Sequence, residues 1–311
     1  MQFDLGLLQH CWFLAGPTAA GKTAAALALA ERLEAEIISL DSMAIYRGMN
    51  IGTAKPAAAE QQRVPHHLID AIDPHEEYSL ADYVAAAEVA ANEISARGKT
   101  VLFAGGTGLY LRGVLRGVFD GPAADWEFRK ELEAAAARGD EDYLHERLKE
   151  VDPDAASKLH PRDHRRIIRA IEVFHQTGRP LSAQHEHGPL PEAKRPRNVF
   201  WLHPPRDWLY DRINRRVDQM LAEGLMEEVE TLLAAPMPLS RTARQALGYK
   251  ETIDHLEGRI EASEMADLIK RRTRQFAKRQ HTWFRNLEEC KAVDITGTET
   301  AEQIASMLVN A

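Results

Sequence analysis

The feature that most constrains this sequence is the stretch GPTAAGKT at residues 16–23. It follows a short apolar run at residues 11–15 and precedes an Ala- and Leu-rich segment at residues 24–33. A buried strand, a glycine-rich loop and a helix, in this order, form the context in which the pattern G-x-x-x-x-G-K-[ST] marks a phosphate-binding loop. We therefore expect an α/β fold, with a parallel sheet flanked by helices and this loop at one edge of the sheet.

The chemistry of the loop explains its residues. Gly16 and Gly21 let the backbone bend so that amide groups point at an anion, and the helix that follows presents its positive end to it. Lys22 adds a positive charge, and the Thr23 hydroxyl can join the coordination sphere of a Mg²⁺ bound to the phosphates. The predicted phosphate-binding residues are Gly16, Pro17, Thr18, Ala19, Ala20, Gly21, Lys22 and Thr23. The loop alone does not indicate which phosphorylated molecule it holds.

One carboxylate stands out among the strand ends. The apolar residues 36–40 end on Asp41, whereas the strand predicted at residues 99–104 runs into the turn GGTG. Ligands of open parallel sheets bind beyond the carboxyl ends of the strands, so Asp41 is expected on the same rim as the phosphate loop. A nucleotide-hydrolysing protein needs an acid at the end of a second strand, which is missing here. Asp41 is thus a candidate base or a group that holds a Mg²⁺ water; the alternative is a turn or cap residue.

The pattern of elements changes in the middle of the chain. Helices are expected at residues 126–138, 140–150, 154–158 and 164–176, without strand signals, and a proline-rich linker at residues 178–197. Residues 198–202 return to an apolar strand, followed by long helices at 208–224, 227–233 and 263–286. We predict a helical insertion domain at residues 119–196 within an α/β core formed by residues 1–118 and 197–311.

The composition excludes several classes of protein. The 311 residues are 44% hydrophobic and 28% charged, with a net charge of −8, as in an ordinary globular protein. We expect no membrane partner, because no apolar stretch reaches the length of a bilayer and the N-terminus lacks a secretion signal. The two cysteines lie far apart, which fits a reducing, cytoplasmic compartment. We expect a monomer.

Paired histidines do not predict a metal site. His66 and His67, His160 and His164, and His185 and His187 lack the carboxylate or thiolate neighbours that such a site needs. Mg²⁺ at the phosphate loop is the one metal that we expect.

Basic residues gather in two clusters. Residues 158–169 hold Lys158, Arg162, Arg165, Arg166 and Arg169 against Asp163 alone, and residues 270–285 hold seven Lys and Arg and no acid. Aromatic residues are interleaved with the second cluster, which favours phosphate contacts and base stacking on structured RNA. The alternative is a solvated helix face that pairs with acids elsewhere in the chain.

Two further arginines follow the last predicted strand. Arg212 and Arg216 are four residues apart on one helix face, where they can reach the phosphate site and stabilise charge on a leaving group. A surface ion pair with Asp211 or Glu223 is the alternative.

Several of these stretches together resemble the tRNA dimethylallyltransferase (tRNA isopentenyltransferase) family. The resemblance covers nearly the whole chain, and the blocks around Asp41 and at residues 278–285 are its most specific parts. Ala44 departs from the pattern, because many members carry Gln there, which puts in question any contact of that side chain with a substrate base. The matching stretches are GPTAAGKT at 16–23, ISLDSMAIYRGMNIGTAKP at 38–56, PHHLID at 65–70, GGTGLYL at 105–111, RRIIRAIEVF at 165–174, ALGYKE at 246–251 and KRQHTWFR at 278–285.

The resemblance implies transfer of a dimethylallyl group from dimethylallyl diphosphate to the exocyclic amine of the adenosine 3′-adjacent to the anticodon in tRNA, with release of diphosphate. Asp41 then accepts the amine proton or a hydrogen bond from it. The loop amides, Lys22, Mg²⁺ on Thr23 and Arg216 or Arg212 stabilise the leaving diphosphate. Thr107 lies where the flipped adenosine enters. No water has to be activated, which accounts for the missing second acid.

The family pattern also implies the residues that contact tRNA, with the helical insertion gripping the anticodon arm. They are Asp41, Ser42, Met43, Ala44, Thr107, Arg129, Arg165, Arg166, Arg169, Gln245, Gly248, Tyr249, Lys250, Lys278, Arg279, Gln280, Trp283 and Arg285.

Three other functions compete with this interpretation. An adenylate isopentenyltransferase uses free AMP or ADP, but a free nucleotide needs neither the helical insertion nor the acid-free run at residues 270–285. A P-loop small-molecule kinase would hold ATP in the loop and its acceptor on Asp41. A nucleotide-gated RNA-binding protein would transfer no group at all.

Overall fold

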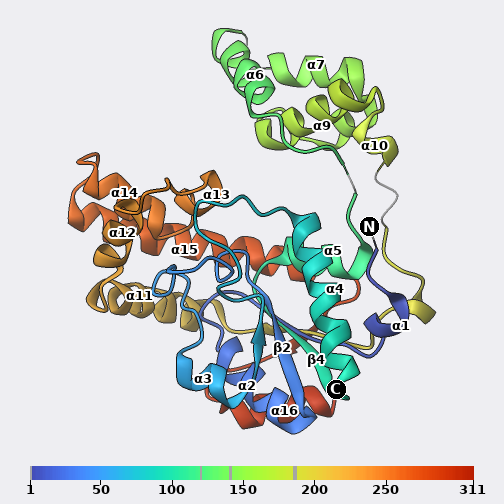
Figure 1. Ribbon diagram of the computed structural model, residues 1–311, viewed down its shortest axis with the longest axis vertical. Helices are drawn as coiled ribbons and strands as arrows, with labels where there is room; N and C mark the ends of the chain where they lie inside the picture. Colours follow the sequence, from blue (N-terminus) through green and yellow to red (C-terminus); the bar gives the residue numbers. More distant parts are fainter. Residues whose placement is uncertain (1, 120, 140–141, 185–187) are drawn as a thin grey trace. The chain divides into compact units, whose positions relative to one another are not determined.

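The computed structural model describes residues 2–119, 121–139, 142–184 and 188–311, which divide into two compact units (Figure 1). Residues 2–117 and 189–311 form one, here called the core unit, and residues 118–188 form the other, the helical unit. Residues 189–196, which the sequence analysis placed in the insertion, group with the core unit. Their contacts explain this, because Arg195 donates to Glu288 at 3.1 Å and Ala193 O accepts from Gln9 at 2.9 Å.

A parallel sheet forms the centre of the core unit. Its six strands in the described residues have the order β3-β2-β4-β1-β5-β6, and every neighbouring pair is parallel. The predicted α/β fold is therefore confirmed. The strands are β1 (Trp12–Ala15), β2 (Ala35–Leu40), β3 (His66–His67), β4 (Thr100–Gly105), β5 (Asn198–His203) and β6 (Lys291–Asp294).

The register of three strands sets the position of the site. Gly105, the last residue of β4, pairs with Ala15 of β1 on one side and with Leu40 of β2 on the other. The segments that begin at Gly16, Asp41 and Gly106 therefore leave the sheet at the same level. Gly105 has no room for a side chain, because a Cβ there would lie 2.5 Å from the Leu40 carbonyl carbon.

Helices cover both faces of this sheet. On one face α2 packs with α16 over apolar residues of the strands, and on the other α4 and α5 lie together, with Tyr83 of α4 donating to Ser39 O of β2 at 2.9 Å (Figure 1). The helices of the core unit are α1 (Leu5–Leu8), α2 (Lys22–Leu33), α3 (Ala58–Arg63), α4 (Leu80–Ala96), α5 (Gly108–Arg116), η1 (Glu192–Lys194), α11 (Arg206–Ala222), α12 (Leu225–Leu233), α13 (Arg241–Arg244), α14 (Tyr249–Leu256), α15 (Ala262–Arg285) and α16 (Ala301–Val309).

The helical unit has its own apolar core, in which Leu132, Leu144, Leu148 and Ile167 are buried. Its helices agree with the predicted positions within a few residues, although Asp140, where the second was expected to begin, lies outside the described residues. The helices are α6 (Trp126–Arg138), α7 (Tyr143–Val151), α8 (Pro153–Lys158), α9 (His164–Thr177) and α10 (Leu181–Gln184). In the described parts of both units, no helix combines the length and apolar character required to span a membrane.

A buried carboxylate ties α6 to α9 in the helical unit. The Glu172 carboxylate accepts hydrogen bonds from Arg129 at 2.8 Å, from Arg169 at 2.5 Å and from the Asp125 amide at 2.7 Å. Burial alone raises the pKa of Glu172, but the hydrogen bonds from the two arginines outweigh it and hold the pKa below its usual value. The charged form of Glu172 therefore stabilises this fold.

Replacing Glu172 by Ala should destabilise the helical unit by about 3–5 kcal/mol, because two arginines then lose their buried partner. Since the folded pKa is lowered, wild-type protein keeps this contribution at neutral pH and loses it as the pH falls below about 4. The loss of stability is measured by urea unfolding, monitored through hydrogen exchange of the α9 backbone amides. Glu146→Ala, which removes an exposed pair with Lys149, is the matched control and should leave the exchange unchanged. Equal losses in the two variants contradict the prediction.

Candidate active site

The ends of β2 and β4 meet through hydrogen bonds at the rim of the sheet. The amides of Gly106 and Thr107 both donate to Leu40 O, at 3.1 and 2.9 Å. The Thr107 hydroxyl accepts from the Ser42 amide at 3.1 Å. Asp41, the candidate base, and Thr107, which the resemblance places where the adenosine enters, thus belong to one continuous rim.

The phosphate loop leaves β1 at the same rim and turns into α2. Gly16 has φ +152° and lies against the Leu202 backbone, and Gly21, the N-cap of α2, has φ +89°. Lys22 donates to Pro17 O at 2.7 Å. Burial, and then the nearby Arg216, lower the pKa of Lys22 to about 7, while the Asp41 carboxylate opposes the shift. Lys22, Arg216 and Asp41 therefore act on one another electrostatically.

The two carboxylate oxygens of Asp41 have different hydrogen-bond surroundings. Oδ1 accepts from the Met43 amide at 2.8 Å and from the Ala44 amide at 3.3 Å, which fixes the turn after β2. This is the turn role that the sequence analysis gave as the alternative. Among the described residues no donor is hydrogen-bonded to Oδ2. The backbone thus holds one oxygen of Asp41 in place, and the other oxygen is not used in a hydrogen bond within the described residues.

The structure separates Arg212 from Arg216 on α11. The Arg212 Nε donates to Ala19 O at 2.9 Å, and its guanidinium stacks on Trp208, 4.7 Å from the ring centre. Arg216 is turned inward: burial lowers its pKa, which the Asp41 carboxylate opposes. Arg212 therefore braces the phosphate loop through a carbonyl, whereas Arg216 supplies its charge between the loop and Asp41.

Gln280 of α15 joins the phosphate loop to the turn after β4. Its Oε1 accepts from the Thr18 amide at 2.9 Å, and its Nε2 donates to Gly106 O at 2.8 Å. Gln280 is buried, with 4% of the residue exposed. The resemblance implies an RNA contact for Gln280, but in this structure both ends of its amide are used inside the protein.

A second internal connection was not found in the sequence. Glu228 of α12 accepts from the amides of Asn50 and Ile51, each at 2.9 Å, and from the Tyr249 hydroxyl at 2.6 Å. The Tyr249 ring fills the space beside Gly52, where a Cβ would lie only 2.4 Å from the ring edge. The sequence analysis singled out the glycine-containing stretches at 38–56 and 246–251. Their positions along the chain do not reveal that they contact each other.

The residues expected to contact tRNA differ in how exposed they are and in whether an acid of the protein already binds them. Gln245, Lys250, Lys278, Arg279, Trp283 and Arg285 of the core unit and Arg165 of the helical unit are exposed, and Ser42, Met43 and Thr107 are partly exposed at the rim. Ala44, Gly248, Tyr249 and Gln280 are buried. Arg129 and Arg169 are held by Glu172, and Arg166 by Asp163.

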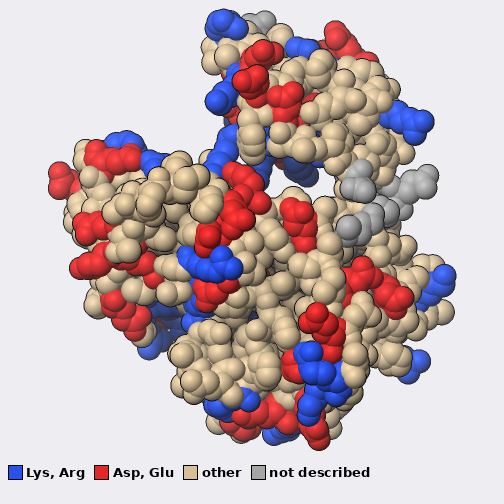
Figure 2. Space-filling model, viewed as in Figure 1, with Lys and Arg blue, Asp and Glu red and all other residues tan. Residues whose placement is uncertain are grey.

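The basic side chains of residues 270–285 also differ in whether they have partners within the protein. Lys270 pairs with Asp218, Arg272 with Glu251, and Arg274 donates to Asn214 Oδ1 at 2.5 Å. Lys270 and Arg272 therefore pair with acids elsewhere in the chain, as the alternative interpretation of this run has it, whereas the partner of Arg274 is an amide. On the face seen in Figure 2, acidic and basic side chains of the core unit adjoin in the same way.

Among the residues expected to bind a metal ion, the candidate lies at the phosphate loop. The described residues contain no group of three or more His, Cys, Asp or Glu side chains that can hold a metal; His185 and His187 lie outside them. Thr23, the second residue of α2, is exposed. A single hydroxyl together with substrate phosphates is a donor set that Mg²⁺ accepts, since it retains water and few protein ligands.

Comparison with known proteins identifies the family. The model of the family described as IPP transferase matches residues 44–287. The tRNA dimethylallyltransferase of Geobacter metallireducens is 48% identical over 282 residues, 91% of each chain. The crystal structure of a tRNA isopentenylpyrophosphate transferase from Bacillus halodurans is 41% identical with a TM-score of 0.71, and covers 97% of this chain and 95% of that one.

A more distant structure agrees with these. It belongs to a eukaryotic dimethylallyltransferase acting on tRNA, is 27% identical with a TM-score of 0.76, and covers 97% of this chain and 77% of that one. Since the family model matches well over half of the chain and the relatives align along nearly all of it, this chain belongs to the IPP transferase family.

Proposed function

We propose that this protein is a tRNA dimethylallyltransferase, which transfers the dimethylallyl group of dimethylallyl diphosphate to the exocyclic amine of the adenosine 3′-adjacent to the anticodon. The observation that carries the proposal is the shared rim on which a phosphate loop, Asp41 and Thr107 lie together. A diphosphate in the loop and an adenine at Thr107 would place the two reactants side by side.

The acceptor amine needs help because its lone pair is delocalised into the adenine ring. Asp41 Oδ2 would accept the amine proton, or a hydrogen bond from it, as the new carbon–nitrogen bond forms. The backbone amides on Oδ1 fix the direction of the carboxylate. Thr107, hydrogen-bonded to Ser42, would border the opening through which the flipped adenosine enters.

Breaking the allylic carbon–oxygen bond leaves charge on the diphosphate. The loop amides, the N-terminus of α2, Lys22 and Arg216 would stabilise that charge. When bound, Mg²⁺ would neutralise part of the diphosphate charge, and Thr23 is the residue placed to hold it. Arg212 acts on the loop through Ala19 O.

Binding of the anticodon stem-loop would use the exposed residues Arg279 and Trp283 of α15, with Gln245 and Lys250. Arg165 and the remaining basic side chains of residues 119–196 would contact the same RNA. Phosphate contacts and stacking on Trp283 suit a single-stranded loop.

An assay with labelled substrates tests the reaction itself. Label from dimethylallyl diphosphate should appear in unmodified tRNA and not in AMP. Label in AMP instead identifies an adenylate isopentenyltransferase, and phosphate transfer from ATP identifies a kinase. Binding of tRNA without transfer of any label leaves only an RNA-binding protein. Each of these three results contradicts the proposal.

Replacing Asp41 by Asn should lower turnover by about 10²–10⁴, because an amide cannot accept the proton. The turn survives, since the amide oxygen still accepts from Met43 and Ala44. Single-turnover transfer rates and tRNA binding measured in parallel separate chemistry from affinity. A near-normal rate with intact tRNA binding removes Asp41 from the reaction.

Arg216 and Arg212 form a matched pair on one helix. Arg216→Gln should lower kcat/KM for dimethylallyl diphosphate by about 10²–10³, since a charge that faces the leaving group is lost. Arg212→Gln removes a brace on Ala19 O and should have the smaller effect on kcat/KM. Steady-state kinetics with saturating tRNA measures both, and a larger loss for Arg212→Gln reverses the assignment.

A further inference from the structure

A surface pocket beside the phosphate loop has no role in the reaction described above. Its cavity of about 420 Å³ lies between α15, the end of β5, the start of α11 and the end of β6. Of the residues at 16–23, all of which the structure describes, Pro17 is the only one in its wall. The pocket is therefore distinct from the concave side of the loop that holds a phosphate.

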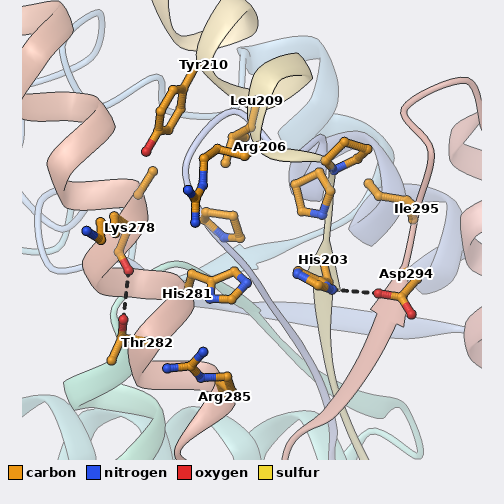
Figure 3. Close-up of a pocket in the computed structure, with 14 residues that line it drawn as sticks. His203, Arg206, Leu209, Tyr210, Lys278, His281, Thr282, Arg285, Asp294 and Ile295 are labelled. Atoms are coloured by element: carbon orange, nitrogen blue, oxygen red, sulfur yellow. Dashed lines mark hydrogen bonds and ion pairs between the residues drawn. The ribbon is translucent and has the colours of Figure 1, made fainter.

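The pocket is cationic. Figure 3 shows Arg206 and Arg285 on either side of the His281 ring, with His203 facing it. In the described part of the chain, neither arginine has a carboxylate partner. Asp294 is the one acid in the wall, and it already accepts from His203 at 2.6 Å. Two uncompensated arginines and two imidazoles thus converge on one cavity, an arrangement that fits an anion with several oxygens.

The pKa of His281 is lowered, as expected for a partly buried imidazole close to other positive groups. Burial lowers its pKa first, and His203, Arg285 and Arg206 lower it further. An anion among these groups would remove the repulsion between them. The rest of the wall includes apolar residues, among them Pro204, Pro205 and Ile295, together with a further cation, Lys278, and the hydroxyl-bearing Thr282 and Tyr210.

The position of the pocket on α15 favours a small anion over RNA. Trp283 lies against α5, where a Cβ on Gly108 would be 2.9 Å from the Trp283 Cβ, next to Thr107. His281 precedes Trp283 by two positions, which is about 200° around a helix, so the pocket opens on the opposite side of α15. If the proposed function holds, RNA that delivers an adenosine to Thr107 lies on the Trp283 side.

We propose that this pocket is a second anion site, which takes a diphosphate group on the side of the phosphate loop away from the adenosine. The group is either inorganic diphosphate, the product, or the diphosphate of the prenyl substrate, since both carry the same oxygens. Arg206 and Arg285 donate to these oxygens from two sides, and His281 and His203 lie between them.

Calorimetric titration of the full-length protein with inorganic diphosphate at fixed Mg²⁺ tests the site. Wild-type protein should bind two equivalents, and Lys22→Ala, which disables the loop, should still bind one. Adding Arg206→Gln to Lys22→Ala should weaken that binding by about tenfold or more. Arg215→Gln, an exposed arginine of the same helix outside the pocket, is the matched control and should change it less than about twofold. A single equivalent for wild-type protein, or none for Lys22→Ala, overturns the proposal.

A measurement on wild-type protein guards against misfolding of these variants. The ring signals of His281, assigned with His281→Gln, should shift as the second equivalent binds, and an unshifted ring contradicts the site. Repeating the titration of Lys22→Ala with dimethylallyl diphosphate shows which source the pocket prefers. If Arg206→Gln weakens tRNA binding and leaves the diphosphate titration unchanged, the pocket is an RNA contact and the proposal is wrong.

This result is independent of the prenyl transfer assay. Two bound diphosphates without prenyl transfer contradict the proposed function alone. Prenyl transfer with one bound diphosphate contradicts the pocket alone.

Discussion

The pairing of Gly105 with Ala15 and Leu40 is the constraint on which the site depends. It brings the ends of β1, β2 and β4 to one level, so that the phosphate loop, Asp41 and Thr107 begin from a common edge. The contact leaves no space for a Cβ at Gly105, 2.5 Å from the Leu40 carbonyl. A side chain there would separate β2 from β4 and with them Asp41 from Thr107. Backbone spacing therefore sets the distance between the phosphate loop, Asp41 and Thr107.

Three residues of helix α15 point to different sides of the helix and contact different parts of the protein. Gln280 points inward and ties the phosphate loop at Thr18 to Gly106 in the turn before Thr107. Trp283 lies against α5, and His281 lines the cationic pocket. A helix turns by about 100° per residue, which is why neighbouring positions of one motif have unrelated partners. The stretch KRQHTWFR thus holds a structural connection as well as the side chains that we propose for binding.

The sequence predicts those parts that local patterns determine. The phosphate loop, the strand before Asp41 and the helices of residues 126–176 follow from periodicity and turn residues. The edge strand β6 was not predicted, because of its four residues only Val293 is buried and no apolar run marks it. Partners distant along the chain were missed for the same reason: nothing local relates Glu228 to Asn50, or Glu172 to Arg129. The separate roles of Arg212 and Arg216 likewise depend on tertiary contacts.

The distribution of paired charges explains how a protein of net charge −8 can bind polyanions. Many arginines are neutralised inside the fold: Arg129 and Arg169 by Glu172, and Arg116 by the buried Glu289. These pairs hold elements together and contribute little to the field outside. The cations without such partners, among the described residues, include Arg206, Lys278 and Arg285 beside the phosphate loop. Net charge is therefore a poor guide to this surface, because an anion senses the unpaired charges within a Debye length of about 8–10 Å and not the total.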